Sequence, residues 1–285
     1  SELFADHAVE FLREAKGQAK PFFMYVAFNA PHDPRQAPKK FVDMYPPDKV
    51  AIPANYLPEH PFDNGAIKIR DEALAPFPRT KEVVRVHRSE YFAIITHMDH
   101  EIGRILRALK KSGREKDTYV VFTADHGLAV GQHGLMGKQN PYDHSIRMPF
   151  MISGPGLAGN ATVNEKIYMQ SVYPTTCELA GLKVPGSVDF KSVLPLVKGE
   201  KGGGEEVIFN AYIETQRLVR TDRYKLVHYP KIGRNQLFDL KKDPHETKDL
   251  IDDPGLKAVK TKLLETLRKK REELGDGLLD AKPGK

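Results

Sequence analysis

The feature of this sequence that most constrains its fold is an apolar run that ends abruptly in polar residues. Residues 118–123 read Thr-Tyr-Val-Val-Phe-Thr, and Ala-Asp-His-Gly follows at once. A run of β-branched and aromatic residues without alternation predicts a buried strand. Ligands of open α/β sheets bind just beyond the carboxyl ends of strands. Asp125 and His126 are therefore candidate ligands of a divalent cation.

A second apolar run, residues 22–28, predicts another strand, apolar on both faces. Such a strand implies a parallel sheet with helices covering both sides. The loop at 29–34 follows, and its two prolines stiffen it around His32. If both strands belong to one parallel sheet, His32 and Asp125 emerge at the same edge. Taken alone, His32 is better explained as an ordinary turn residue.

Periodicity and composition predict the remaining elements. Apolar residues at helical spacing predict helices over 1–16, 81–111, 171–181 and 254–274, and a short strand over 150–153. The polar stretch 198–206 predicts a linker between residues 1–197 and a C-terminal subdomain, 207–285. In that subdomain, four short antiparallel strands are expected at 207–212, 217–220, 224–229 and 236–239.

An ordered series of motifs over residues 123–149 resembles the downstream signature of sulfatases, within the alkaline-phosphatase-like superfamily. The series is Thr-Ala-Asp-His-Gly, then Gly-Gln-His-Gly-Leu, then Gly-Lys, then Tyr-Asp-His-Ser-Ile-Arg-Met-Pro. Asp-His-Gly alone is also an ordinary strand-to-turn signal. Residues 239–246 resemble a further turn found late in sulfatases. The resemblance covers nearly the whole chain, but only the downstream part of a sulfatase.

The resemblance implies roles for individual residues. Asp125 and His126 would ligate a divalent cation, expected to be calcium, with His126 standing where many relatives have Asn. Lys138, a point charge suited to an oxyanion, would contact the sulfate. His32 would contact it too and protonate the leaving oxygen, since a histidine pKa lies near neutrality. His133 is close enough in sequence to join the pocket as a substrate contact.

The proline-rich stretch 37–79 has little periodicity and predicts an irregular insertion. Long insertions in compact domains are usually functional or disordered. Its turn at 60–65 is either a plain surface turn or part of the substrate pocket, with Asn64 as the candidate contact.

The family also uses an upstream Asp-Asp metal-binding pair and a formylglycine nucleophile made from Cys-x-Pro-x-Arg. Here the one cysteine, Cys177, is followed by Glu-Leu-Ala-Gly, and Asp-Asp occurs only at 252–253. Covalent sulfate transfer needs an activated nucleophile. We therefore expect the truncated or proteolysed C-terminal portion of a sulfatase, inactive alone, with formylglycine in the missing part.

The expected fold is α/β: a mostly parallel sheet with helices on both faces, alkaline-phosphatase-like but partial, plus a small C-terminal antiparallel α+β subdomain. The expected substrate is a small-molecule or carbohydrate sulfate ester. Two alternatives stay open: a phosphonate monoester or phosphodiester hydrolase of the same superfamily, and a non-catalytic binding relative.

Composition limits the partners. The 285 residues include 44 Lys and Arg and 38 Asp and Glu, which gives a net charge of +6. The charges are scattered apart from the basic last helix, which a solvated face explains more simply than nucleic acid. No apolar run approaches the ~18 residues that span a membrane. No signal peptide is visible, so a periplasmic or secreted location is expected only if the missing N-terminus carries one. The missing part should leave apolar surface exposed, which predicts a homo-oligomer.

Overall fold

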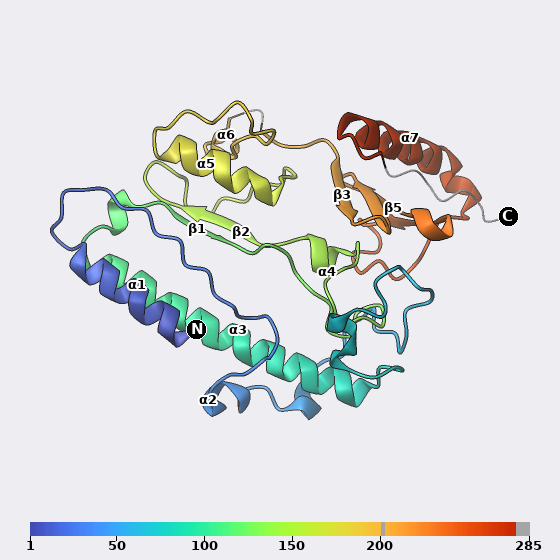
Figure 1. Cartoon of the computed structure of the whole chain (residues 1–285), viewed down its shortest axis with the longest axis horizontal. Helices are drawn as coiled ribbons and strands as arrows, with labels where there is room; N and C mark the ends of the chain where they lie inside the picture. Colours follow the sequence, from blue (N-terminus) through green and yellow to red (C-terminus); the bar gives the residue numbers. More distant parts are fainter. Residues whose placement is uncertain (201–202, 278–285) are drawn as a thin grey trace. The chain divides into compact units, whose positions relative to one another are not determined.

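The computed structural model describes residues 1–200 and 203–277, and Figure 1 labels their helices and strands. The chain forms two compact units. Unit 1 comprises Ser1–Pro53, Arg79–Val121 and Ile152–Pro155, and unit 2 comprises Ala54–Pro78, Phe122–Met151 and the described residues from Gly156 onward.

Two helices dominate unit 1. Helix α1 (Glu2–Glu14) lies alongside the long helix α3 (Lys81–Lys111), as Figure 1 shows. Helix α3 begins where the hydroxyl of Thr80 accepts the Val83 N–H at 3.3 Å, which satisfies one unpaired amide of the first turn. Both predicted helices are confirmed. The short helix α2 (Lys39–Val42) packs against α3, where the Phe41 and His97 rings stack at 5.1 Å.

The strand predicted over residues 22–28 is wrong. The segment is extended, but it belongs to no strand of the described sheets. The Phe22 and Phe28 rings pack edge-on against Phe11 and Phe4 of α1. Alternate side chains point to solvent, and Tyr25 is 82% exposed. Continuous apolarity predicted burial on both faces, whereas the described structure covers only one of them.

Strands β1 (Val120–Thr123) and β2 (Phe150–Ser153) pair in a two-stranded sheet. The Thr123 hydroxyl donates to the Pro149 carbonyl at 2.9 Å, next to the start of β2. Both predicted strands are confirmed, although β1 starts two residues late and is half-buried rather than buried. The mostly parallel character of a larger sheet stays a prediction.

Unit 2 contains a second sheet of four antiparallel strands in the order β3-β4-β5-β6. The strands, all of them predicted, are β3 (Ile208–Tyr212), β4 (Gln216–Arg220), β5 (Tyr224–Tyr229) and β6 (Arg234–Asp239). Helix α7 (Lys257–Glu273), preceded by the 3₁₀ turn η6 (Pro254–Leu256), confirms the predicted last helix.

The two faces of this sheet are covered by different parts of the chain. On one face, Leu263 and Leu267 of α7 pack with the alternate residues Val219, Leu226 and Leu237. On the other face, Leu218, Val227 and Phe238 pack with Ala129, Leu135 and Tyr142. The loop that follows Asp125 and His126 is therefore part of the core of unit 2.

Three shorter helices complete unit 2: α4 (Asp143–Ile146), α5 (Val172–Leu179) and α6 (Leu194–Val197). Helix α5 confirms the helix predicted at 171–181, and it buries Cys177. The predicted linker 198–206 includes residues 201–202, which lie outside the described residues. Next to them, Glu205 forms an isolated bridge with Lys166. The predicted boundary between 1–197 and 207–285 stays a prediction.

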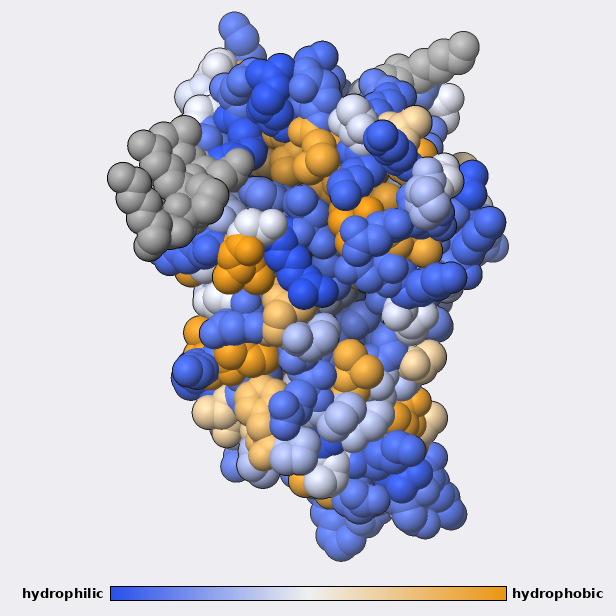
Figure 2. Space-filling view, turned by 90° about the vertical axis from the view of Figure 1, so that its right-hand side faces the viewer, coloured by the Kyte–Doolittle hydropathy of each residue, from blue (hydrophilic) through white to orange (hydrophobic). Residues whose placement is uncertain are grey.

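The surface seen in Figure 2 is mainly hydrophilic, with apolar residues in several separate patches. Within the part of the chain that the structure describes, no helix is both long and apolar enough to cross a membrane.

Candidate anion and metal site

Asp125 and His126 lie immediately after the end of β1. The Asp125 Oδ1 accepts the His126 backbone N–H at 2.9 Å. The His126 Nδ1 lies 2.9 Å from the Gly127 carbonyl, which can only accept, so Nδ1 carries the proton. The neutral ring then presents the lone pair of Nε2, and this atom lies 3.7 Å from Asp125 Oδ2. Two acceptor atoms thus face one another, on side chains that are 80% exposed in Asp125 and 39% exposed in His126.

This arrangement fits a divalent cation. Histidines that bind metals usually donate their other ring N–H to a carbonyl or carboxylate, as His126 does. Asp125 supplies an anionic oxygen and His126 a neutral nitrogen. No group of three or more metal-ligating side chains occurs among the described residues, so this pair supplies only part of a coordination sphere.

Gly127 allows helix α4 to pack against this turn. Its N–H donates to the Ser145 carbonyl at 2.7 Å. A Cβ at this position would lie 2.1 Å from the His144 carbonyl oxygen, so a side chain cannot be accommodated without moving the backbone. The backbone of α4 therefore holds the turn that carries Asp125 and His126.

The loop from Gly127 to Gly137 folds back and brings Lys138 near the start of the loop. The Ala129 N–H donates to the Gly137 carbonyl at 2.9 Å, and the Gly131 N–H donates to the Leu135 carbonyl at 2.8 Å. The glycines suggested a flexible loop, but its apolar residues are buried against the antiparallel sheet. Lys138 is thus returned by a packed loop rather than a mobile one.

Lys138 lies beside a buried carboxylate. Its Nζ is 3.7 Å from Asp71 Oδ2, and the two side chains are 20% and 7% exposed. Burial acts to raise the pKa of Asp71. Hydrogen bonds from Arg70 and Gln139, together with the charge of Lys138, outweigh that effect and hold the pKa below its usual value. The adjacent Glu72 accepts the backbone N–H groups of residues 136 and 137.

Sequence reasoning missed Asp71 and Glu72. They lie in the 3₁₀ turn η2 (Arg70–Leu74), inside the proline-rich insertion, more than sixty residues before the loop they contact. The only signal was a pair of adjacent acids next to apolar residues. Nothing local indicates which distant backbone such a pair will bind.

His133 and Asn64, the other candidate substrate contacts, have internal partners. His133 is 5% exposed and stacks on Tyr142, with ring centroids 3.8 Å apart. The side-chain oxygen of Asn64 accepts the Ala66 N–H at 2.9 Å, while its carbonyl accepts a hydrogen bond from Gln216. Both side chains are buried, and their contact with substrate stays a prediction.

His32 belongs to unit 1. Its Nδ1 lies 2.9 Å from the Asp33 carbonyl and 3.2 Å from Asp33 Oδ1, and the side chain is 41% exposed. Its predicted convergence with Asp125, His126 and Lys138 stays a prediction.

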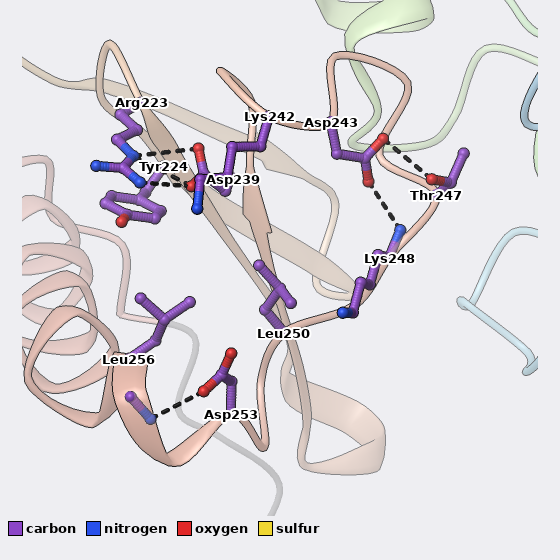
Figure 3. Close-up of a pocket in the computed structure, with 11 residues that line it drawn as sticks. Arg223, Tyr224, Asp239, Lys242, Asp243, Thr247, Lys248, Leu250, Asp253 and Leu256 are labelled. Carbon is purple, nitrogen blue, oxygen red and sulfur yellow. Dashed lines mark hydrogen bonds and ion pairs between the residues drawn. The ribbon is translucent and has the colours of Figure 1, made fainter.

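A separate hollow of about 500 Å³ lies beside the last strand of the antiparallel sheet (Figure 3). Its acidic groups already have partners within the chain. Asp239 binds Arg223, Asp243 accepts from Thr247 and the Lys248 N–H, and Asp253 accepts the Gly255 N–H. None of the candidate site residues lines it.

Comparisons with known proteins agree with the motif series. The family model described as Sulfatase matches residues 1–182, and the model described as N-sulphoglucosamine sulphohydrolase, C-terminal, matches residues 131–273. An arylsulfatase of Clostridium perfringens is 29% identical over 284 residues, which are 96% of this chain and 58% of that protein. A choline-sulfatase of Rhizobium meliloti is 32% identical over 248 residues, with coverages of 82% and 47%.

Among solved structures, the phosphonate monoester hydrolase of Agrobacterium radiobacter is similar with a TM-score of 0.79 at 26% identity. The match covers 95% of this chain and 60% of that one. The predicted alkaline-phosphatase-like α/β fold is thereby confirmed. The chain spans about half the length of the curated relatives it matches. With the first family model covering more than half of its residues, the chain belongs to the sulfatase family.

Proposed function

We propose that this chain carries the downstream half of the active site of a sulfuric ester hydrolase. The observation that supports the proposal most directly is the packed loop between Gly127 and Gly137. It joins the Gly137 carbonyl, next to Lys138, to the Ala129 N–H, four residues after Asp125. Hydrolysis of a sulfate ester requires a positive group that binds the sulfate and side chains that bind the cation. Residues 125–138 would supply both, through Lys138 and through Asp125 with His126.

Asp125 and His126 would hold the cation, expected to be calcium. Calcium takes about six to eight oxygen ligands, so other groups must supply most of its coordination sphere. When bound, the cation supplies positive charge that orients and polarises an oxygen of the sulfate group. The hydrogen bond from His126 Nδ1 to the Gly127 carbonyl keeps Nε2 as the atom that faces Asp125.

Lys138 would bind a sulfate oxygen and stabilise the charge that develops during transfer. We assign His32 as the donor of the proton to the leaving oxygen. Its Nδ1 is held by Asp33, so Nε2 is the ring atom assigned to proton transfer. His133 and Asn64, both buried, are proposed as further substrate contacts.

The chain contains no formylglycine motif. Cys177 is buried in α5 and lacks the Cys-x-Pro-x-Arg context. We therefore propose that residues 1–285 do not complete sulfate transfer alone, and that formylglycine and further metal ligands come from outside this chain. The sulfate ester, of a small molecule or a carbohydrate, is not specified by these residues. A homo-oligomer is a further proposal, and a periplasmic or secreted location is proposed on the condition that the missing N-terminus carries a signal peptide.

A second candidate is hydrolysis of a phosphonate monoester or phosphodiester. The structural similarity to a phosphonate monoester hydrolase supports it. Asp125, His126 and Lys138 suit a tetrahedral phosphoryl group as well as a sulfate. The same fold without a nucleophile would also serve a non-catalytic binding protein.

Titration of inorganic sulfate into the chain, with calcium present, tests the proposal. Chemical shifts followed by NMR should change at Lys138 and at residues 125–127. Lys138→Ala should weaken sulfate binding at least about ten-fold, the loss expected for one charge-assisted contact. The matched control is Lys241→Ala, an exposed lysine of unit 2. Equal sulfate affinity of the two variants would contradict the assignment of Lys138.

A further inference from the structure

We propose that Asp71 and Glu72 are positioning residues that hold Lys138 ready for an anion. The proposal rests on the proposed function of Lys138, which it deepens. Neither carboxylate is assigned a chemical step. One fixes the backbone that leads into Lys138, and the other fixes the direction of its ammonium group.

Glu72 fixes the backbone. Its side chain is 4% exposed. Oε2 accepts the Met136 N–H at 2.9 Å, and Oε1 accepts the Gly137 N–H at 2.9 Å. A carboxylate that accepts two amide protons makes charge-assisted hydrogen bonds, which are stronger than neutral ones. Both residues that precede Lys138 are therefore held by one buried side chain.

Gly137 is what lets the acidic pair come so close. A Cβ there would lie 2.8 Å from Glu72 Oε1 and 3.1 Å from the Cβ of Asp71. The carbonyl of Gly137 is also fixed, because it accepts hydrogen bonds from the Ala129 N–H and from the Asn140 side chain. The residue before Lys138 is thus held on both its donor and its acceptor side.

Asp71 fixes the side chain of Lys138 and is itself fixed. Its Oδ1 accepts two hydrogen bonds from Arg70, at 2.9 and 2.7 Å. Its Oδ2 accepts one from the Gln139 amide at 3.1 Å and lies 3.7 Å from Lys138 Nζ. Because Asp71 and Lys138 are both largely buried, solvent and salt screen their attraction only weakly.

The distance between Asp71 and Lys138 suits positioning. A charge-assisted N–H···O bond measures about 2.7–2.9 Å, so the 3.7 Å separation directs the ammonium group without a short bond. Lysine carries a flexible four-carbon stem, and ordering it when an anion binds lowers affinity. A stem that is already ordered by Asp71 avoids most of that loss.

The role of Asp71 determines whether Asp71→Asn weakens or tightens sulfate binding. If Asp71 merely neutralised Lys138, replacing it with asparagine would remove a repulsive charge and tighten sulfate binding. If it positions Lys138, the same replacement weakens binding, because the stem must then be ordered by the anion. Asp71→Asn should therefore raise the Kd for inorganic sulfate about two- to ten-fold, the range expected for immobilising one such side chain.

The experiment uses the 285-residue chain, ¹⁵N-labelled, with inorganic sulfate as the probe. The ammonium signal of Lys138 is identified by its loss in Lys138→Arg. Its order parameter should be higher than that of exposed Lys241, and should fall to that level in Asp71→Asn. Asp63→Asn is the matched control, because Asp63 lies in the same insertion and its carboxylate accepts only the nearby Gly65 N–H among its described contacts.

A milder variant protects the test against misfolding. Gln139→Ala keeps every charge and removes two hydrogen bonds of the Gln139 side chain, one donated to Asp71 and one accepted from the Lys138 backbone N–H. It should change the order parameter in the same direction by a smaller amount. An unchanged order parameter in both variants, or tighter sulfate binding by Asp71→Asn, overturns the proposal. If the order parameter falls but sulfate never perturbs Lys138 in the unmodified chain, positioning stands and the proposed function of Lys138 fails.

Discussion

Three histidines of unit 2 are held neutral inside the protein, and His133 is the best defined of them. Its Nε2 accepts a hydrogen bond from the Asn55 side chain at 3.0 Å, while the His133 backbone N–H donates to the Asn55 backbone carbonyl at 2.7 Å. Burial lowers its pKa to about 3, with nearby His60 and Lys225 acting in the same direction. Burial also lowers the pKa values of His60 and His144.

These lowered pKa values predict acid sensitivity. The unfolded chain binds a proton at each histidine below about pH 6.5, whereas folded His133 stays neutral down to about pH 3. Its contribution to stability is therefore complete above pH 6.5 and is lost as the pH falls toward 3. The free energy of unfolding that His133 contributes falls by up to about 1.4 kcal/mol per pH unit.

His133→Gln should flatten this dependence by up to that slope between pH 6.5 and 4. Urea unfolding at several pH values measures it. His7→Gln is the control, because His7 is exposed on α1. An equal slope in His133→Gln and the unmodified chain would contradict the neutral, buried state of His133.

At the scale of elements, α4 is joined to the antiparallel sheet through a buried ion cluster. Lys225 of β5 is fully buried, and its Nζ lies 2.5 Å from Asp143 Oδ1 and 2.6 Å from Glu246 Oε1. Glu246 also accepts the Asp143 N–H at 2.7 Å. Since α4 packs on Gly127, the cluster connects the sheet to the candidate metal-binding turn.

Lys225→Met should destabilise the protein by about 3–5 kcal/mol, because it leaves buried Glu246 without its cation and Asp143 with Arg220 alone. Chemical denaturation at pH 7 measures the change. Lys231→Met is the matched control, since Lys231 forms an exposed ion pair with Glu214 and its loss should matter little. Similar stabilities of the two variants would show that the cluster contributes no more than a surface pair.

Elements that local pattern determines were predictable. The apolar stripe of α3 gave its type and bounds, because that helix buries one face. The short runs between turn residues, such as 221–223, gave the four C-terminal strands and most of their bounds. The strand predicted over residues 22–28 was wrong, because apolarity alone does not supply the neighbouring strand that a sheet requires. Within the described residues, the segment packs on α1 instead.

At the scale of the whole molecule, the candidate site was predictable in part. Asp125, His126 and Lys138 lie within one short motif series, so the sequence indicates them together. Asp71 and Glu72 act on that series from a distant irregular segment. Their role depends on tertiary packing that no local pattern encodes. His133 differs in the opposite way: it lies inside the motif series, but it is buried as part of the core.

The last prediction concerns turnover by the chain itself. Covalent sulfate transfer requires an activated nucleophile within reach of the sulfur atom. The one cysteine, Cys177, is buried in α5 outside the formylglycine context, and it does not belong to the loop that carries Lys138. Purified chain 1–285, supplied with calcium, should therefore not hydrolyse an aryl sulfate such as 4-nitrophenyl sulfate above the background of buffer.

The release of 4-nitrophenolate, followed by absorbance, measures this. Lys138→Ala, prepared in the same way, distinguishes activity of the chain from that of a contaminating sulfatase, because only activity of the chain depends on Lys138. Turnover by the unmodified chain that Lys138→Ala abolishes would mean that a nucleophile lies within residues 1–285. Turnover that is equal in both would be assigned to a contaminant, and further purification should remove it.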